Sequence, residues 1–272
     1  SVANTVNIEK LLEFAIFIKD KKSANPISIL SVVANNNEAE INLLKTKNKL
    51  ATFEKQAAAS EIKLNILTTI DHNAASGITR TSREIMADMI VLGWPKPTGF
   101  IDRLVGIRPD GILNKTDKTA FFCSFKKPLV LHKRIVITAP PLAEYENGFS
   151  LWMIKMTKLA QELSIPILLY CNEGTQKATK RLFEITKPAA AITIKDFTDW
   201  EDYLILARTI QADDIIVLIS ARKGASSFMG VLESLPSKLE KHFSGNSKIV
   251  IFPQQLENEF NGEQYIDIST EP

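Results

Sequence analysis

Apolar and polar positions along this chain follow two periods, one typical of buried strands and one typical of helices. Apolar, β-branched runs of about 4–8 residues predict strands, and they lie within 25–33, 62–70, 89–95, 134–141, 165–174, 189–197, 213–220 and 248–255. Segments with helical spacing separate them, at 7–22, 38–60, 81–90, 148–163, 176–185 and 198–210. Strands that are apolar throughout and alternate with helices predict parallel sheets covered on both faces.

Helix faces and helix starts give sharper local predictions. Within 38–60, the spacing predicts one apolar face, made of Ile41, Leu44, Leu50, Phe53 and Ala57. Two sequences have the spacing of a capping box, Thr81-x-x-Glu84 and Thr198-x-x-Glu201. Because such a box satisfies free amides at a helix start, we expect a helix to begin at each threonine.

The second half of the chain repeats the pattern of the first. The best internal match pairs ADMIVLG at 87–93 with DDIIVLI at 213–219. Two repeats of this size predict two tandem doubly wound domains, spanning 1–131 and 132–272 and joined near 125–134. In the first domain we expect the first strand to be truncated, since only SVANT precedes the first helix.

Composition narrows the classes of function. The 272 residues are 45% hydrophobic and 24% charged, with a net charge of +2. This balance is typical of a globular protein, and it argues against nucleic acid as a partner, because phosphate-backbone binding needs concentrated positive charge. The two cysteines, Cys123 and Cys171, lie among apolar residues without metal-ligand spacing, so we expect buried reduced thiols. No apolar run reaches the ~18–20 residues that span a bilayer.

The loop ARKGASS at 221–227 is the candidate ligand site. It follows the strand at 213–220, and ligands of open parallel sheets bind at the carboxyl ends of strands. Its backbone amides and cations suit an anion or phosphate group, whereas an ordinary strand-to-helix turn is the alternative. The candidate residues are Arg222, Lys223, Gly224, Ser226 and Ser227 in this loop, and Gly93, Thr98 and Gly99 in the matching loop of the first repeat.

Both loops carry a family resemblance. The segments DMIVLGWPKPTGFIDRLVG and DDIIVLISARKGASSFMGVLESLPSKL, the latter followed by KIVIFPQQ, resemble universal stress protein domains, which are similar to adenine nucleotide alpha hydrolases. The resemblance implies two such domains in tandem. In that family a Gly-x2-Gly-x9-Gly-Ser/Thr loop holds ATP phosphates, so ATP, AMP or another nucleotide is the implied cofactor.

The chain departs from the family's nucleotide-binding pattern. Gly93, Gly99 and Gly106 are separated by five and six residues, and Gly224 and Gly230 also miss the spacing. Asn4 and Pro140 stand where ATP-binding members have an aspartate on the adenine side. Glycine is needed where backbone approaches phosphate closely, so these departures argue against nucleotide binding, and the second loop is the better anion site.

A narrower resemblance concerns the context of the chain. LISARKGASSF and VLESLPSKLEKHFSGNSKIVIFPQQ resemble the cytoplasmic C-terminal region of bacterial sodium/proton antiporters. This implies a regulatory, non-enzymatic module on the cytoplasmic side of the inner membrane. Its partners would be an N-terminal membrane antiporter domain and, in a homodimer, a second copy. The alternatives are a free-standing tandem stress protein that binds adenine nucleotide and a nucleotide-hydrolysing enzyme that depends on Arg222 or Lys223.

The other candidate residues do not form a catalytic or metal site by pattern. Asp71 and His72 are adjacent on a strand end without a nearby nucleophile, and a polar turn is the favoured interpretation. His132 and His242 are isolated from other ligand types. Trp94, Trp152 and Trp200 lie in different elements and are predicted to pack. EYENGF at 144–149 is predicted to be an ordinary acidic turn.

Overall fold

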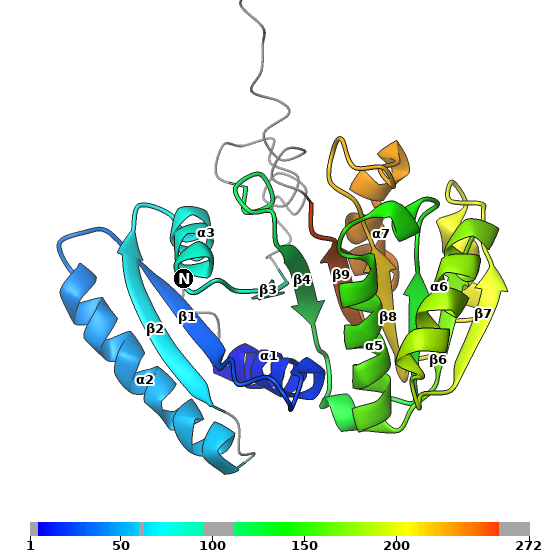
Figure 1. Ribbon diagram of the computed structural model, residues 1–272. Helices are drawn as coiled ribbons and strands as arrows, with labels where there is room; N and C mark the ends of the chain where they lie inside the picture. The colour runs from blue at the N-terminus through cyan, green and yellow to red at the C-terminus, as the bar shows by residue number, and fades with distance from the viewer. Residues whose placement is uncertain (1–4, 60–62, 95–110, 256–272) are drawn as a thin grey trace, which may run out of the picture.

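The computed structural model describes residues 5–59, 63–94 and 111–255, and these follow the predicted alternation of strands and helices (Figure 1). The first half contains α1 (Thr5–Ile18), β1 (Ile27–Ala34), α2 (Ala39–Ala59), β2 (Leu64–Asp71), α3 (Ala74–Glu84), β3 (Met89–Gly93) and β4 (Thr119–Ser124). The second half contains η1 (Leu129–Leu131), β5 (Arg134–Thr138), η2 (Ala143–Tyr145), α5 (Phe149–Leu163), β6 (Ile167–Cys171), α6 (Glu173–Thr186), β7 (Ile192–Asp196), η3 (Tyr203–Arg208), β8 (Asp214–Ile219), η4 (Gly230–Glu233), α7 (Leu235–His242) and β9 (Ser247–Phe252).

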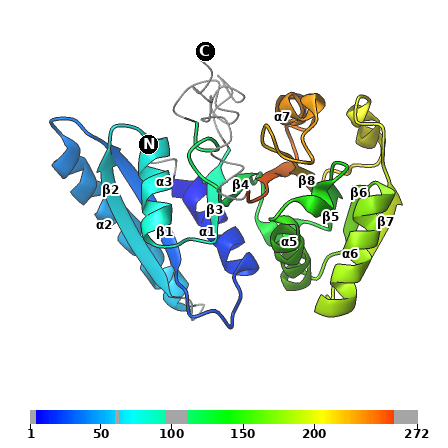
Figure 2. The ribbon, with the colours of Figure 1, turned by 45° about the horizontal axis from the view of Figure 1, so that its top comes forward.

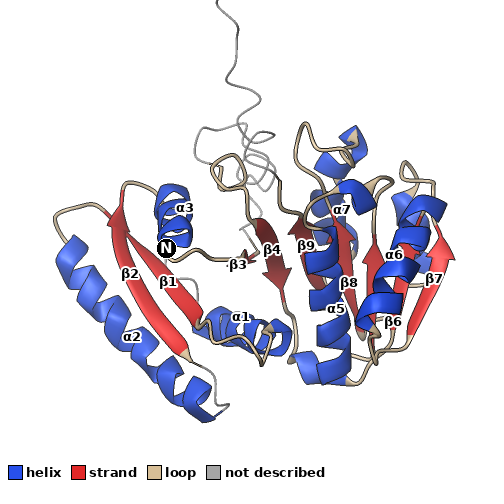
Figure 3. Cartoon of the chain, in the orientation of Figure 1, coloured by secondary structure: helices blue, strands red, loops and turns tan. Residues whose placement is uncertain are grey.

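One seven-stranded sheet crosses the boundary between the halves (Figure 3). Its order is β3-β4-β9-β8-β5-β6-β7, and among the described strands β4 with β9 is the one antiparallel pair. β1 and β2 form a separate parallel pair. The predicted α/β fold with a mostly parallel central sheet is therefore confirmed. The division into two tandem domains stays a prediction, because β3 and β4 continue the sheet of the second half.

The seam between the halves joins corresponding strands. β4 and β9 are each the last described strand of their half, and Phe122 lies opposite Val250 in their pairing. Antiparallel pairing of equivalent strands relates the two halves locally by an approximate two-fold axis. The pairing also covers the edges that β4 and β9 would otherwise expose, and exposed edges invite pairing with other chains.

Each face of the large sheet buries its own apolar layer. Along β8, Ile215, Val217 and Ile219 lie in the layer with α5, while Ile216 and Leu218 lie in the layer with α7. This explains why β8 is apolar at every position: both faces are covered. Trp152 and Trp200 are buried in these two layers, as their predicted packing role requires.

Helix α1 belongs to both parts of the molecule. Its Phe14 and Ile18 are buried in the layer that contains α5, and the Phe14 ring contacts the ring of Phe121 on β4. Leu12, on another side of the same helix, packs with Leu50 of α2 in a small third cluster. Figure 2 shows α1 between the β1–β2 pair and the large sheet.

Two predicted helix starts are wrong. α3 begins at Ala74 rather than at Thr81, because the Asn73 side chain accepts a hydrogen bond from the amide of Ser76 and caps the helix there. Thr81 and Glu84 are instead close to its end. The predicted helix at Thr198 is replaced by the short 3-10 helix η3, which has no side-chain cap. In α3 the cap at Asn73 starts the helix before the predicted threonine. In η3 no side-chain cap forms, so the capping-box spacing predicts neither helix start.

Two further expectations need correction. Leu50 and Phe53 of α2 are buried as predicted, but Ile41 and Leu44 are 56% and 61% exposed, so the first turns of the helix do not bury the predicted face. The fifth residue of that face, Ala57, has no described side chain. Strand β4 was not predicted.

Among the described residues, no helix combines the length and apolar composition that crossing a bilayer requires.

Candidate functional site

The loop after β8 lies at the carboxyl ends of the central strands, as predicted, but its arginine is turned inward. Arg222 is 7% exposed, and its guanidinium donates hydrogen bonds to the backbone carbonyls of Thr116 and Lys118. Both acceptors belong to the segment that leads into β4, in the first half. Arg222 therefore links the two halves at the end of the sheet where β8 finishes.

Burial also weakens the case for Arg222 as a free anion ligand. Removal from water lowers the pKa of its guanidinium to about 10, and the nearby carboxylates of Asp117 and Glu146 oppose that shift. The Nε of Arg222 and the Oγ of Ser227 are buried without a hydrogen-bond partner among the described residues. Two donor groups thus remain unsatisfied beside the loop.

A carboxylate of the chain itself accepts the amide hydrogen bond that a ligand anion would accept. Glu146, which follows η2 in the loop between β5 and α5, is 8% exposed, and its Oε1 accepts a hydrogen bond of 2.8 Å from the Ser227 amide. A backbone amide at such a loop is the usual partner of a phosphate oxygen. The segment predicted to be an ordinary acidic turn therefore supplies an anion of the chain itself to the loop.

The rest of the loop is more open. Lys223 is half exposed and forms a 3.2 Å salt bridge with Glu233 of η4. Gly224 has a φ of +83°, a conformation that suits glycine, and Ser226 is exposed. These residues can still contact a solute, but the anion site of the sequence prediction stays a prediction.

The matching loop of the first half is only partly described. Gly93 is the last residue of β3, and a Cβ placed on it would lie 3.6 Å from a methyl group of Leu11, an ordinary contact. Thr98 and Gly99 lie outside the described residues. On the adenine side, Pro140 is buried two residues after the end of β5, and Asn4 lies outside the described residues.

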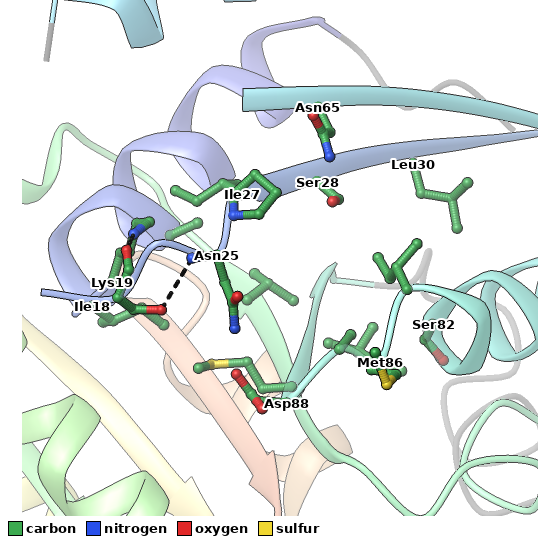
Figure 4. A pocket seen from close by; sticks show the side chains of 18 of the residues that line it. Ile18, Lys19, Asn25, Ile27, Ser28, Leu30, Asn65, Ser82, Met86 and Asp88 are labelled. Atoms are coloured by element: carbon green, nitrogen blue, oxygen red, sulfur yellow. Dashed lines mark hydrogen bonds between the residues drawn. The ribbon is translucent and has the colours of Figure 1, made fainter. Parts of the chain in front are cut away.

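A second candidate site is a cavity of about 760 Å³ between β1 and β3. Figure 4 shows Ser28 and Leu30 of β1 on one side of it, and Ser82, Met86 and Asp88 on the other. A smaller cavity of about 290 Å³ lies nearby, between the same two strands and the apolar face of α1. The sequence prediction did not include this region.

Lys155 of α5 and Asp88 are two of the four charged residues that line the larger cavity, with Lys19 and Asp20. Burial lowers the pKa of Lys155, and the neighbouring Lys158 lowers it further. Asp88 and Asp20 act in the opposite direction. A half-buried amine beside a carboxylate can bind either an anion or a peptide terminus, yet the sequence spacing of these residues gives no sign that they meet.

The remaining candidates have structural partners. Asp71 ends β2, accepts from the His72 amide and lies 3.3 Å from Arg80, which fits the predicted polar turn. His132 is buried between the Leu129 carbonyl and the Ser247 hydroxyl, and burial lowers its pKa. Cys123 and Cys171 are buried, free thiols, and burial raises the pKa of each. In the described part of the chain, no group of three metal-ligating side chains forms.

Comparison with known proteins supports the fold but not a family membership. No family model matches the chain, and no curated protein matches it. Among solved structures, it is similar to a universal stress protein from Archaeoglobus fulgidus, with a TM-score of 0.56 and 13% identity over 92% of this chain and 93% of that one.

A transporter domain has the same architecture. The cytoplasmic domain of a prokaryotic cation chloride cotransporter matches with a TM-score of 0.59 and 12% identity, covering 95% of this chain and 96% of that one. Both matches run over nearly the whole length of both chains. At these identities they establish the architecture alone: the chain has a universal stress protein-like α/β fold.

Proposed function

We propose that this chain is a cytoplasmic regulatory module of a sodium/proton or other cation antiporter, and that it acts by binding rather than by catalysis. The observation that carries the proposal is one hydrogen bond: the Glu146 carboxylate accepts from the Ser227 amide. In a stress protein, a nucleotide phosphate would bind at this loop. The fold is retained while its usual anion position is closed. Such a chain is suited to interactions between proteins more than to nucleotide turnover.

The similarity to a cotransporter's cytoplasmic domain supports the transporter context. That likeness extends over 95% of this chain, so it includes both halves and the seam between them. The antiporter assignment itself comes from the sequence resemblance around 218–228 and 231–255. Fold alone does not specify function, and the proposal therefore needs a transport measurement.

The proposed mechanism is a shift between arrangements of the halves. Arg222 and α1 both connect the two halves, one by hydrogen bonds to the carbonyls of Thr116 and Lys118 and the other by apolar packing. A partner or small ligand that favours one arrangement of these contacts changes the equilibrium between states. The attached transporter then responds by the same coupling free energy.

The first experiment is to follow the reading frame upstream of Ser1 and to assay the whole polypeptide. If hydrophobic segments precede this chain, sodium-driven proton flux in inverted membrane vesicles should change when residues 1–272 are deleted. An Arg222→Gln variant should change that flux in the same direction, and Arg208→Gln, in η3, serves as the control. An initiation codon next to Ser1, or flux that deletion leaves unchanged, would contradict the proposal.

The second candidate function is a free-standing tandem stress protein that binds adenine nucleotide. The exposed positions Lys223 and Ser226, with the unsatisfied hydroxyl of Ser227, favour it. Calorimetric titration with ATP, AMP and cyclic dinucleotides separates the candidates. Binding that is lost in Lys223→Ala supports the stress protein, and turnover of magnesium-ATP would instead identify an enzyme.

A further inference from the structure

Two cavities in the described part of the chain meet at one short segment. The 760 Å³ cavity and another of about 550 Å³ share residues 86–89 and Lys155 in their linings. Residues 86–89 run from the end of α3 to the first residue of β3, in the first half, whereas Lys155 lies on α5, in the second half. Both halves of the chain therefore face this junction, and cavities of this size suit small-molecule ligands.

Two charged side chains at the junction lack the partners that the other charged residues of both linings have. The side chains of Asp88 and Lys155 make no hydrogen bond or salt bridge with any described residue. They act on each other, since Asp88 raises the pKa of Lys155 while burial lowers it. The charged lining residues with partners inside the chain are Lys19, Asp20, Arg83, Asp117 and Lys118. One amine and one carboxylate are thus left for a ligand.

Met86 holds an apolar side chain at the same junction, in an unfavourable backbone conformation. At the end of α3 the Ala87 amide donates to the Ser82 carbonyl. The Met86 amide donates to the Arg83 carbonyl, which completes a helix ending whose left-handed position is usually glycine. Met86 has a φ of +50° and is 82% exposed, so a Cβ is strained there and little of the side chain packs against the protein. Strained residues of this kind gather at ligand sites.

The charges of the junction select the kind of ligand. A simple anion would be attracted by Lys155 and repelled by Asp88, and a simple cation would meet the reverse. A molecule with a carboxylate and an ammonium group a few bonds apart can form charge-assisted hydrogen bonds with both. Met86 adapts to an apolar group attached beside those charges, and the half-buried Leu151 of α5 offers a second apolar contact.

We propose that the junction of the two cavities binds a free α-amino acid with an apolar side chain: Lys155 binds its carboxylate, Asp88 its ammonium group and Met86 its side chain. Because Asp88 and Lys155 come from different halves, a bound amino acid favours the arrangement in which they lie close together. This regulatory role rests on the proposed function, whereas the binding itself does not.

The experiment is calorimetric titration of residues 1–272 with L-leucine and with two analogues that each lack one charge, 4-methylpentanoate and 3-methylbutylamine. We expect L-leucine to bind, and each analogue to bind about tenfold more weakly or worse, since each loses a charged hydrogen bond. Lys155→Gln and Asp88→Asn should each weaken leucine binding by about the same factor. The matched control is Lys158→Gln, in the same helix but outside both linings, which should leave the affinity unchanged.

Met86→Gly separates a role in binding from a role in the fold. Glycine suits the left-handed position, so the melting temperature of the free chain should rise while the affinity for L-leucine falls several-fold. A purely structural residue would not move these two measurements in opposite directions.

The outcomes decide the proposal. Leucine binding that needs both charges of the ligand and both Asp88 and Lys155 supports it. It is overturned by a chain that binds no leucine at millimolar concentration, by 4-methylpentanoate binding as tightly as leucine, or by affinity that the variants at Asp88, Lys155 or Met86 leave unchanged. The flux measurement on the whole polypeptide is independent of this titration, so failure here is distinct from failure of the transport proposal.

Discussion

β3 and β8 carry nearly the same sequence in different surroundings. β8 has strands on both sides and is buried at every residue, and its leading Asp214 is paired with Arg134. Among the described strands, β3 has one neighbour; it is half-buried at four of its five residues, and the preceding Asp88 is exposed. The comparison shows that an apolar run specifies a strand, whereas the partner strands determine how much that strand contributes to the stability of the fold.

The largest expected difference in stability is between two leucine variants, one in β6 and one in β1. Leu169→Ala in β6 should lower the free energy of unfolding by about 4 kcal/mol, because Leu169 is fully buried and its removal leaves a cavity. Leu30→Ala in β1 should cost about 1 kcal/mol, since that side chain already borders the 760 Å³ cavity. Urea unfolding measures both. Equal losses would contradict the difference between the halves.

The next largest difference in stability should be between variants of the paired aspartate, Asp214, and of the exposed one, Asp88. Asp214→Ala leaves Arg134 without its carboxylate in a largely buried position and should cost about 3 kcal/mol. Asp88→Ala should change stability by about 0.5 kcal/mol or less, as expected of an exposed position. Urea unfolding of both variants measures the difference. A loss at Asp88 as large as the loss at Asp214 would contradict it.

Glu146→Ala should cost about 1–2 kcal/mol, because the Ser227 amide then stays buried without an acceptor. It should also open the loop to solutes. Titration with inorganic phosphate, followed by the amide resonance of Ser227, should shift that resonance in the variant but not in the unmodified chain. The control is Glu144→Ala, which removes a hydrogen bond to Thr175 instead. A phosphate response in the unmodified chain would show that Glu146 does not close the site.

The smallest expected effect is a pH dependence at the seam. His132 is buried and bonded to Ser247 of β9, and burial lowers its pKa in the folded state. The unfolded chain therefore binds a proton at higher pH than the folded one. The contribution of His132 to stability is complete above the unfolded value of 6.5 and is lost as the pH falls from there toward the folded pKa.

Variants at the two histidines measure this effect. His132→Gln should flatten the fall in melting temperature between neutral and mildly acidic pH. His242→Gln, at the exposed end of α7, is the control and should leave the slope unchanged. A slope that His132→Gln does not alter would assign the acid sensitivity of the protein to other groups.

Local pattern predicted most elements of this fold, because strands covered on both faces are apolar at every position. It missed β4, whose six residues lie next to a basic linker and contain Cys123 between Phe122 and Ser124. It could not predict that β4 pairs with β9, since that pairing joins distant segments. The capping-box spacing at Thr81 was misleading because Asn73, eight residues earlier, forms the actual cap.

The candidate loop was located correctly, but its chemistry was not visible in the sequence. ARKGASS suggests a cationic loop, yet Arg222 points to carbonyls of residues 116 and 118 in the first half. Glu146 reaches Ser227 across a separation that no local motif records. The 760 Å³ cavity has no sequence signal of its own, because residues from distant segments line it.

The antiparallel seam has a consequence for synthesis on the ribosome. β4 is made early, but the strand that covers its edge, β9, comprises residues 247–252. At about 5–20 residues per second, β4 waits roughly 6–25 seconds for its neighbour. During that time its buried phenylalanines are exposed to other nascent chains. A chaperone that binds extended apolar segments should therefore associate with residues 119–125 until β9 has been synthesised.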